Sequence, residues 1–136
     1  MIQILVVDDD DINNFLLEHL LKKSSYALTM KVLTSPVEAV SYIKQSYNDH
    51  KNIDLLLLDI NMPMMTGWEV LDELRVNGKS LLNGNKVYML SSSVQSTDKE
   101  KAGEYNEVSG FISKPITLDL LSTIFKEIRD PNEKGS

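Results

Sequence analysis

Cysteine is missing from this chain of 136 residues, and basic residues are fewer than acidic ones. Without cysteine the protein has no disulfide framework, no thiolate zinc site and no thiol nucleophile. The 14 lysines and arginines against 20 aspartates and glutamates give a formal net charge of −6. That balance disfavours direct binding to nucleic acid or to an anionic membrane, because phosphate-rich surfaces need a basic footprint. No apolar run approaches the roughly 20 residues that a membrane-spanning helix needs.

What the chain does contain is enough for one globular domain. Its length lies near the roughly 100–150 residues of most single domains, and 42% of its residues are hydrophobic. The apolar start, Met1 to Val7, is too short for a signal peptide and has no basic leader. We therefore expect a cytoplasmic protein, with a domain over residues 1–130 and a disordered tail over residues 131–136.

Continuous apolar runs of strand length divide the chain. Residues 2–7 and 53–58 are almost wholly apolar, and each run is followed by an aspartate. Runs without alternation are typical of strands that are covered on both faces, as in a parallel sheet. Residues 87–90 and 110–112 indicate two more buried strands, and residues 30–33 indicate a less buried edge strand.

Helical signals lie between these runs. Ile12, Phe15, Leu16 and Leu20 have the spacing of one helix face, so we expect this stripe to face the core. Alternation of strands and helices, five times over, predicts an α/β fold with a parallel sheet covered by helices on both faces. Four helices are expected to begin at capping residues, and the third is expected to stop at a glycine: Ser35, Thr66, Thr97 and Thr117, with Gly78 as the stop.

The ends of the predicted strands carry the polar residues. Asp8–Asp11 follow the first strand, Asp59 the third, Ser91 the fourth and Lys114 the fifth. Ligands of parallel sheets bind outside the carboxyl ends of the strands, so neighbouring strands would bring these groups into one crevice. Crowded carboxylates raise one another's pKa, and a hard divalent cation such as Mg²⁺ relieves that repulsion. A lysine and a hydroxyl beside the cation favour a phosphoryl group over a carbonyl substrate.

The acids at these ends also have simpler interpretations. Asp59 could accept a phosphoryl group covalently, or it could cap a turn. Asp8 and Asp9, directly after the first strand, suit metal binding better than capping. Asp10 and Asp11 suit the start of a helix, where acids are favoured and one of the two would be the cap.

Four short motifs resemble the receiver domain of two-component response regulators, and the resemblance covers about residues 2–129. Each motif is weak alone, but all four stand in the right order at the ends of predicted strands. The resemblance implies a flavodoxin-like (βα)5 three-layer sandwich with a five-stranded parallel sheet in the order 2-1-3-4-5. The motifs are Ile4-Leu5-Val6-Val7-Asp8-Asp9, the stretch from Asp59 to Gly67, Leu90-Ser91-Ser92 and Lys114-Pro115.

The resemblance also implies roles for the residues of the crevice. Asp59 would accept a phosphoryl group from a phosphohistidine of a sensor histidine kinase or a phosphotransfer protein. Mg²⁺ would be held by Asp8, Asp9, Asp59 and the backbone carbonyl of Asn61. These roles make the protein a phosphorelay component rather than an enzyme, with at most slow self-dephosphorylation.

Further roles fall on the last two predicted strands. Lys114 would contact the phosphoryl group, and Pro115 would follow a cis peptide. Ser91 would move to the phosphate as the switch hydroxyl, and Phe111 would change rotamer with it. Many relatives carry a tyrosine at the position of Phe111. The phenylalanine ring lacks the phenol hydroxyl of that tyrosine.

The leading interpretation is a stand-alone receiver that signals through a changed protein-interaction surface. That surface would comprise the fourth helix, the fifth strand and the fifth helix, and it could bind a downstream protein or a second copy of the chain. Three alternatives stay open at this point. The chain could be the N-terminal part of a longer regulator, a receiver-like module that is not phosphorylated, or an Asp-nucleophile Mg²⁺ phosphohydrolase with Asp8-Asp9-Asp10 as its DxD pattern.

Overall fold

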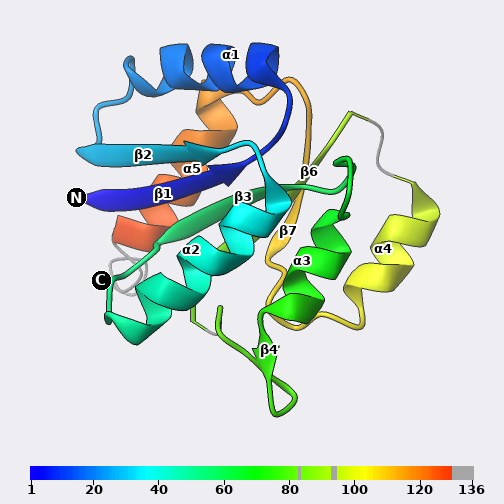
Figure 1. Ribbon diagram of the computed structural model, residues 1–136. Coiled ribbons are helices and arrows are strands. Elements are labelled where there is room, and N and C mark those ends of the chain that lie inside the picture. The colour runs from blue at the N-terminus through cyan, green and yellow to red at the C-terminus, as the bar shows by residue number, and fades with distance from the viewer. Residues whose placement is uncertain (83, 93–94, 130–136) are drawn as a thin grey trace.

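The fold is a five-stranded parallel sheet between two layers of helices (Figure 1). The computed structural model describes residues 1–82, 84–92 and 95–129. The expected tail at 131–136 and the last residue of the expected domain lie outside the described residues. The observed strand order confirms the expected order 2-1-3-4-5. From one edge to the other, the strands are β2 (Leu28–Leu33), β1 (Ile2–Val7), β3 (Leu55–Asp59), β6 (Lys86–Ser91) and β7 (Gly110–Ser113).

Each face of the sheet has its own hydrophobic core, and successive side chains of a strand point to opposite cores. In β1, Leu5 and Val7 pack into one core and Ile4 and Val6 into the other. This is why the runs in the sequence are continuously apolar. One face of the sheet carries α1 (Asp11–Leu21) and α5 (Leu118–Arg129), and the other carries α2 (Pro36–Asn48), α3 (Gly67–Glu73) and α4 (Ser96–Ala102).

Among the described residues, no helix is long and apolar enough to cross a membrane.

Three of the expected caps are confirmed. The side chains of Ser35, Thr66 and Thr117 each accept a hydrogen bond from the main-chain N–H three residues further on, at 3.2–3.3 Å. Thr66 is also the donor of a reciprocal bond, because its own N–H reaches the Glu69 carboxylate at 2.9 Å. A capping box of this kind satisfies two main-chain donors at the start of α3.

The fourth helix begins earlier than expected and is short. Its cap is Gln95, whose N–H donates to the Asp98 carboxylate at 3.2 Å, so the prediction of a cap at Thr97 is wrong. None of the residues of α4 is buried. The segment is held instead by Tyr105, which follows the helix, is buried, and donates its hydroxyl to Asp72 of α3 at 2.8 Å. A helix with so little apolar contact has little tertiary stabilisation.

The face of α1 that packs on the sheet differs from the expected one. Ile12 is 74% exposed, Phe15 is 62% exposed and Leu16 is also exposed, whereas Leu17 and Leu21 are buried. The apolar pattern of this helix contains two adjacent stripes, and the prediction took the wrong one. The outer surface of α1 therefore presents apolar side chains to solvent, next to the exposed Glu18 and His19.

Two asparagines explain why α1 turns this way. The Asn13 side-chain amide donates to the Asp8 carboxylate at 2.9 Å, and the Asn14 amide donates to the Asp8 carbonyl at 2.9 Å. Both asparagines are buried. Polar residues lower the apparent hydrophobicity of a helix face, but here the amide N–H groups of both asparagines bond to Asp8 and hold that face inward. Among the described residues, the buried Oδ1 of Asn14 has no hydrogen-bond partner.

An antiparallel hairpin follows α3, where the prediction expected the helix to continue. The helix ends at Glu73, and β4 (Arg75–Val76) pairs with β5 (Lys79–Ser80). The turn residues Asn77 and Gly78 have φ values of 54° and 78°. Positive φ at both positions is typical of the tight turn that Asn-Gly favours. Gly78 is thus a turn residue, and its prediction as a helix stop is wrong.

Candidate functional site

Three aspartates meet at the carboxyl ends of β1 and β3. Each of Asp8, Asp9 and Asp59 offers a carboxylate oxygen, and these oxygens lie within 4.8 Å of one another. They meet because β1 and β3 are hydrogen-bonded neighbours in parallel register. Asp8 and Asp59 are buried, whereas Asp9 is exposed. Asp10, the next residue, caps α1 by accepting from two main-chain N–H groups, as expected for one of these acids.

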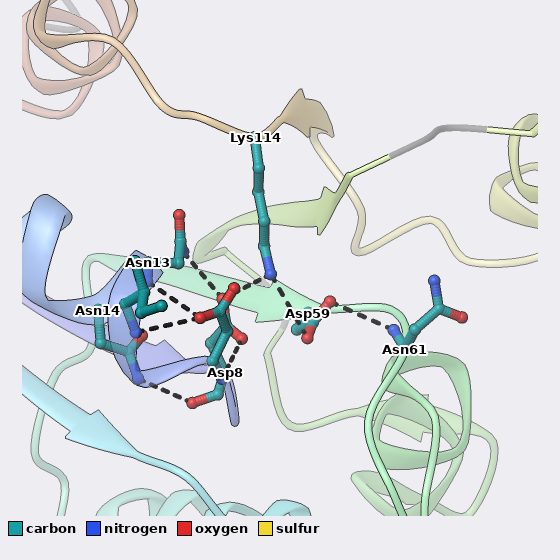
Figure 2. A network of polar contacts seen from close by, with 8 residues as sticks. Asp8, Asn13, Asn14, Asp59, Asn61 and Lys114 are labelled. Carbon is teal, nitrogen blue, oxygen red and sulfur yellow. Dashed lines mark hydrogen bonds and ion pairs between the residues drawn. The ribbon is translucent and has the colours of Figure 1, made fainter.

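Lys114 reaches into the same crevice from the loop after β7. Its ammonium nitrogen lies 2.9 Å from Asp8 Oδ2 and 3.6 Å from Asp59 Oδ2, so it bridges the two buried carboxylates (Figure 2). Its main-chain N–H donates to the Ser91 carbonyl at 2.9 Å, and the peptide to Pro115 is cis, as expected. Burial opposes the charge on Lys114, but the hydrogen bond to Asp8 and the charges of both aspartates raise its pKa above the ordinary value.

Asp59 carries a carboxyl of this cluster whose ionised form is disfavoured. Burial and the nearby charge of Asp8 raise its pKa from 3.8 to about 7, although Lys114 and the Asn61 N–H act in the opposite direction. A carboxylate whose pKa is raised by burial and by a like charge is one that needs further positive charge. The arrangement therefore favours a second cation beside Lys114.

The turn after β3 fixes Asp59 from the other side. The Asn61 N–H donates to Asp59 Oδ1 at 3.3 Å, and the Gly67 N–H donates to the Ile60 carbonyl at 2.8 Å. A Cβ atom at Gly67 would lie 2.5 Å from the Asp59 carbonyl oxygen. Only glycine allows this close approach of α3 to the end of β3.

Comparison with known families shows which family this fold belongs to. The response regulator receiver domain family matches residues 4–126. The chain belongs to this family. The match confirms the resemblance that the four motifs carry, and it covers the whole of the receiver site described above.

Curated relatives of this receiver are much longer proteins. It is 32% identical over 122 residues to the 3′,5′-cyclic-nucleotide phosphodiesterase regA of Dictyostelium discoideum, a match that covers 88% of the chain and 14% of that relative. It is 30% identical over 127 residues to the sensor protein EvgS of Escherichia coli strain K12, covering 93% of the chain and 10% of that relative. The chain thus spans only a small part of the length of these relatives.

Solved structures match over nearly the full receiver. A two component response regulator from Cytophaga hutchinsonii has a TM-score of 0.83 and 29% identity, over 94% of this chain and 96% of that one. The Mn²⁺-bound form of the response regulator Rcp1 has a TM-score of 0.71 and 25% identity, over 93% and 92% of the two chains. Both likenesses agree with the receiver fold.

The two residues expected to switch lie on neighbouring strands of the receiver. Ser91 is buried at the end of β6, and its carbonyl oxygen accepts from the Lys114 N–H. Phe111 is half-buried in β7, and its ring packs edge-on against Trp68 with centroids 6.2 Å apart. Trp68 in turn lies 5.1 Å from the ring of Tyr105, next to α4. A row of aromatic rings therefore connects β7 with the segment that holds α4.

Sequence reasoning missed the two asparagines that hold Asp8. The predicted site included neither Asn13 nor Asn14, yet both donate to Asp8 (Figure 2). Their only signal in the sequence is their position one turn after the run of aspartates. Side-chain amides in the first turn of α1 can reach back to Asp8, because α1 begins only three residues after that aspartate at the end of β1.

The donor set of the crevice fits a hard divalent cation. The three aspartates supply only oxygen ligands, which is what Mg²⁺ and similar ions prefer. The raised pKa of Asp59 indicates a repulsion that a cation would relieve. The buried carboxylate of Asp8, held by the amide of Asn13, would be an oriented ligand rather than a mobile one.

Proposed function

We propose that this receiver accepts a phosphoryl group on Asp59 from a phosphohistidine of a sensor histidine kinase or a phosphotransfer protein, and that it acts as a signalling switch rather than as an enzyme. One observation carries the proposal: Asp59 is a buried carboxylate with a raised pKa, beside Asp8 and bridged to it by Lys114. A capping aspartate would need none of these neighbours. In the phosphohydrolase alternative, with a nucleophile in Asp8-Asp9-Asp10, Asp59 would have no role.

The chain's own residues can carry out the transfer. An oxygen of ionised Asp59 forms a bond to phosphorus, and the bond from phosphorus to the histidine nitrogen breaks. That nitrogen keeps the electron pair, and the ring leaves as neutral imidazole because its other nitrogen carries a proton. Asp8, Asp9, Asp59 and the Asn61 carbonyl would hold Mg²⁺, which when bound offsets the charge of the carboxylates and of the phosphoryl oxygens. Lys114 would neutralise another phosphoryl oxygen, because its ammonium already points between the two buried aspartates.

The first test needs no protein partner. The chain is incubated with Mg²⁺ and acetyl phosphate, and the intact protein is weighed by mass spectrometry. We expect an adduct of one phosphoryl group in the wild type and none in Asp59→Asn, because an amide does not attack phosphorus. Steady phosphate release without an adduct, abolished by Asp8→Ala, would instead establish the phosphohydrolase.

The exposed face of α1 is proposed as the surface that the phosphohistidine protein covers. A donor that brings its histidine to Asp59 must lie over the carboxyl edge of the sheet, and α1 begins there, directly after the aspartates. Its outer side offers Ile12, Phe15 and Leu16, and Phe15 is stacked on His19 at 5.3 Å. Contiguous apolar side chains on a surface typically mark a binding site.

Phe15→Ser is expected to slow transfer from a phosphorylated kinase or phosphotransfer domain by about tenfold, as for an aromatic anchor in an interface. Phosphorylation by acetyl phosphate should keep its wild-type rate, because the crevice is intact. Ala27→Ser, at another exposed apolar residue directly before β2 and so far from the crevice, is the control. Equal slowing in the two variants, or slowing with acetyl phosphate, would remove α1 from the donor interface.

The output surface would comprise α4, β7 and α5. None of the residues of α4 is buried, and the rings of Phe111, Trp68 and Tyr105 connect β7 to its end. A movement of Phe111 with Ser91 could therefore shift α4 at small energetic cost. This surface would bind a downstream protein or a second phosphorylated copy.

A further inference from the structure

A hollow separates the last turns of α2 from the β4–β5 hairpin. Its volume is about 660 Å³, and Lys44, Tyr47, Val76, Lys79 and Leu81 are among the residues that line it. Because α2 ends before β3 begins, and the hairpin precedes β6, this hollow lies toward the amino ends of the strands (Figure 1). It is thus at the opposite edge of the sheet from Asp59.

A second hollow continues the first. Its volume is about 300 Å³, it shares Tyr47 and Leu81 with the first, and it adds His50 and Lys51. We call the two hollows together the α2–hairpin groove. The shared residues make it one continuous surface feature rather than two separate pockets.

We propose that the α2–hairpin groove binds an acidic segment of a partner protein that also carries an apolar anchor residue. The charge of the groove is the first reason. Lys44, Lys51 and Lys79 line it, and no aspartate or glutamate is among its described lining residues. In a chain with a net charge of −6, this is a local reversal of sign that would attract a negatively charged segment.

The lysines of the groove differ from the two lysines that form ion pairs among the described residues. Lys86 pairs with Glu127, and Lys114 pairs with Asp8 and Asp59. Within the described part of the chain, Lys44, Lys51 and Lys79 form no ion pair. Their charges are therefore available to a partner without the loss of an existing interaction.

The apolar floor of the groove is the second reason. Tyr47 is 56% exposed and Val76 is 50% exposed, with Leu81 half-buried between them. The hairpin that presents Val76 is held by the tight Asn77-Gly78 turn. A rigid apolar floor with a charged rim is the usual anatomy of a protein interface.

A peptide segment fits these features better than nucleic acid or a membrane. A long polyanion would also meet the acidic remainder of the surface, and the apolar floor offers nothing to a phosphate backbone. Because the groove is remote from Asp59, occupancy should not depend on phosphorylation. The groove would hold the receiver to a partner in both signalling states, a role beyond the proposed phosphoryl acceptance.

The test selects short randomised peptides displayed on phage against the full chain. Peptides that also bind the double variant Lys44→Glu with Lys79→Glu are removed by counter-selection. We expect the surviving peptides to combine aspartate or glutamate with a large apolar residue. Their affinity, measured by fluorescence anisotropy, should fall about tenfold in the double variant.

The matched control is Lys22→Glu with Lys23→Glu, which makes the same charge change at exposed lysines just after α1. This control should bind the selected peptides with wild-type affinity. Val76→Ser, which leaves the charge of the groove unchanged, should bind them more weakly. Circular dichroism checks that all variants are folded. The peptide selection and these affinity measurements involve no phosphoryl transfer, so they test the groove independently of the proposed function.

Several outcomes would overturn the groove as an acidic-peptide site. These are enrichment of basic or uncharged peptides, equal weakening in the control variant, and no peptide that survives counter-selection. A short DNA duplex, or vesicles of anionic lipid, bound more tightly than the peptides and lost in the double variant, would assign the groove to that other partner. Equal affinity in the absence and presence of acetyl phosphate supports the constitutive role, and a difference contradicts it.

Discussion

Asp59→Asn is expected to make the metal-free protein more stable than the wild type at neutral and alkaline pH. Burial and Asp8 raise the pKa of Asp59 to about 7, so the folded state disfavours its ionised form. The substitution removes that charge, keeps the shape, and leaves Lys114 paired with Asp8 at 2.9 Å. A shift of this size corresponds to at most about 4 kcal/mol. We expect about 2 kcal/mol at about pH 8, since water at the open side of the crevice screens the charges.

The pH dependence of unfolding tests the direction of this stability difference in a second way. Above about pH 5 the unfolded chain has already lost the Asp59 proton, whereas the folded chain keeps it until the pH passes about 7. The folded state thus binds more protons in this window, and its stability falls as the pH rises. Urea unfolding in the presence of EDTA should show the gap between variant and wild type widening from about pH 5 to about pH 8.

Added Mg²⁺ should close the gap. Millimolar Mg²⁺ is expected to stabilise the wild type, by about 1.4 kcal/mol when the free ion is roughly tenfold above its dissociation constant, and Asp59→Asn much less. Asp54→Asn is the matched control, because Asp54 is a carboxylate outside the crevice that accepts from the Gln3 N–H at 2.7 Å. Two results would contradict a cluster of crowded carboxylates. One is that Asp59→Asn is less stable than the wild type in EDTA, and the other is that Mg²⁺ stabilises Asp59→Asn as much as the wild type.

The sheet and the crevice could be predicted because they depend on short, strongly patterned stretches. The apolar run of β3 must be buried on both faces, and the aspartate after it must then stand at the carboxyl edge. The same reasoning placed Asp8 and Lys114 at strand ends on the same carboxyl edge of the sheet, where the structure has them 2.9 Å apart. These positions were predictable because the arrangement of strands in a parallel sheet fixes where the strand ends lie, whatever the packing of the side chains.

The parts that could not be predicted depend on interactions between side chains. The orientation of α1 depends on the bonds of Asn13 and Asn14 to Asp8, and hydrophobic periodicity carries no information about such bonds. The end of α3 and the hairpin after it were missed for a different reason. Asn77-Gly78 is a strong turn signal, but the strands on either side are only two residues long and have no alternating pattern. The two surfaces proposed for partners, on α1 and beside the hairpin, both come from these unpredicted parts.

Gly67→Ala is expected to cause the largest loss of stability of any glycine-to-alanine substitution among the described glycines. The new Cβ would lie 2.5 Å from the Asp59 carbonyl oxygen and 2.9 Å from Met89 Cε. Met89 can change its rotamer only within a filled core, and the carbonyl belongs to a central strand that cannot shift alone. The start of α3 would have to move away from β3, at a cost of about 3 kcal/mol.

The same movement should reach the phosphoryl site. The Gly67 N–H donates to Ile60, next to Asp59, so a displaced α3 pulls on the turn that holds the Asp59 carboxyl. We expect phosphorylation by acetyl phosphate to slow by about tenfold even where the variant is folded, because a misplaced nucleophile loses its alignment. Gly103→Ala is the matched control: its φ of −62° suits alanine and its nearest contact is 3.2 Å, so the stability should stay within about 1 kcal/mol of the wild type. Wild-type stability in Gly67→Ala, or equal losses at the two glycines in urea unfolding, would show that the close approach of α3 to β3 does not constrain Asp59.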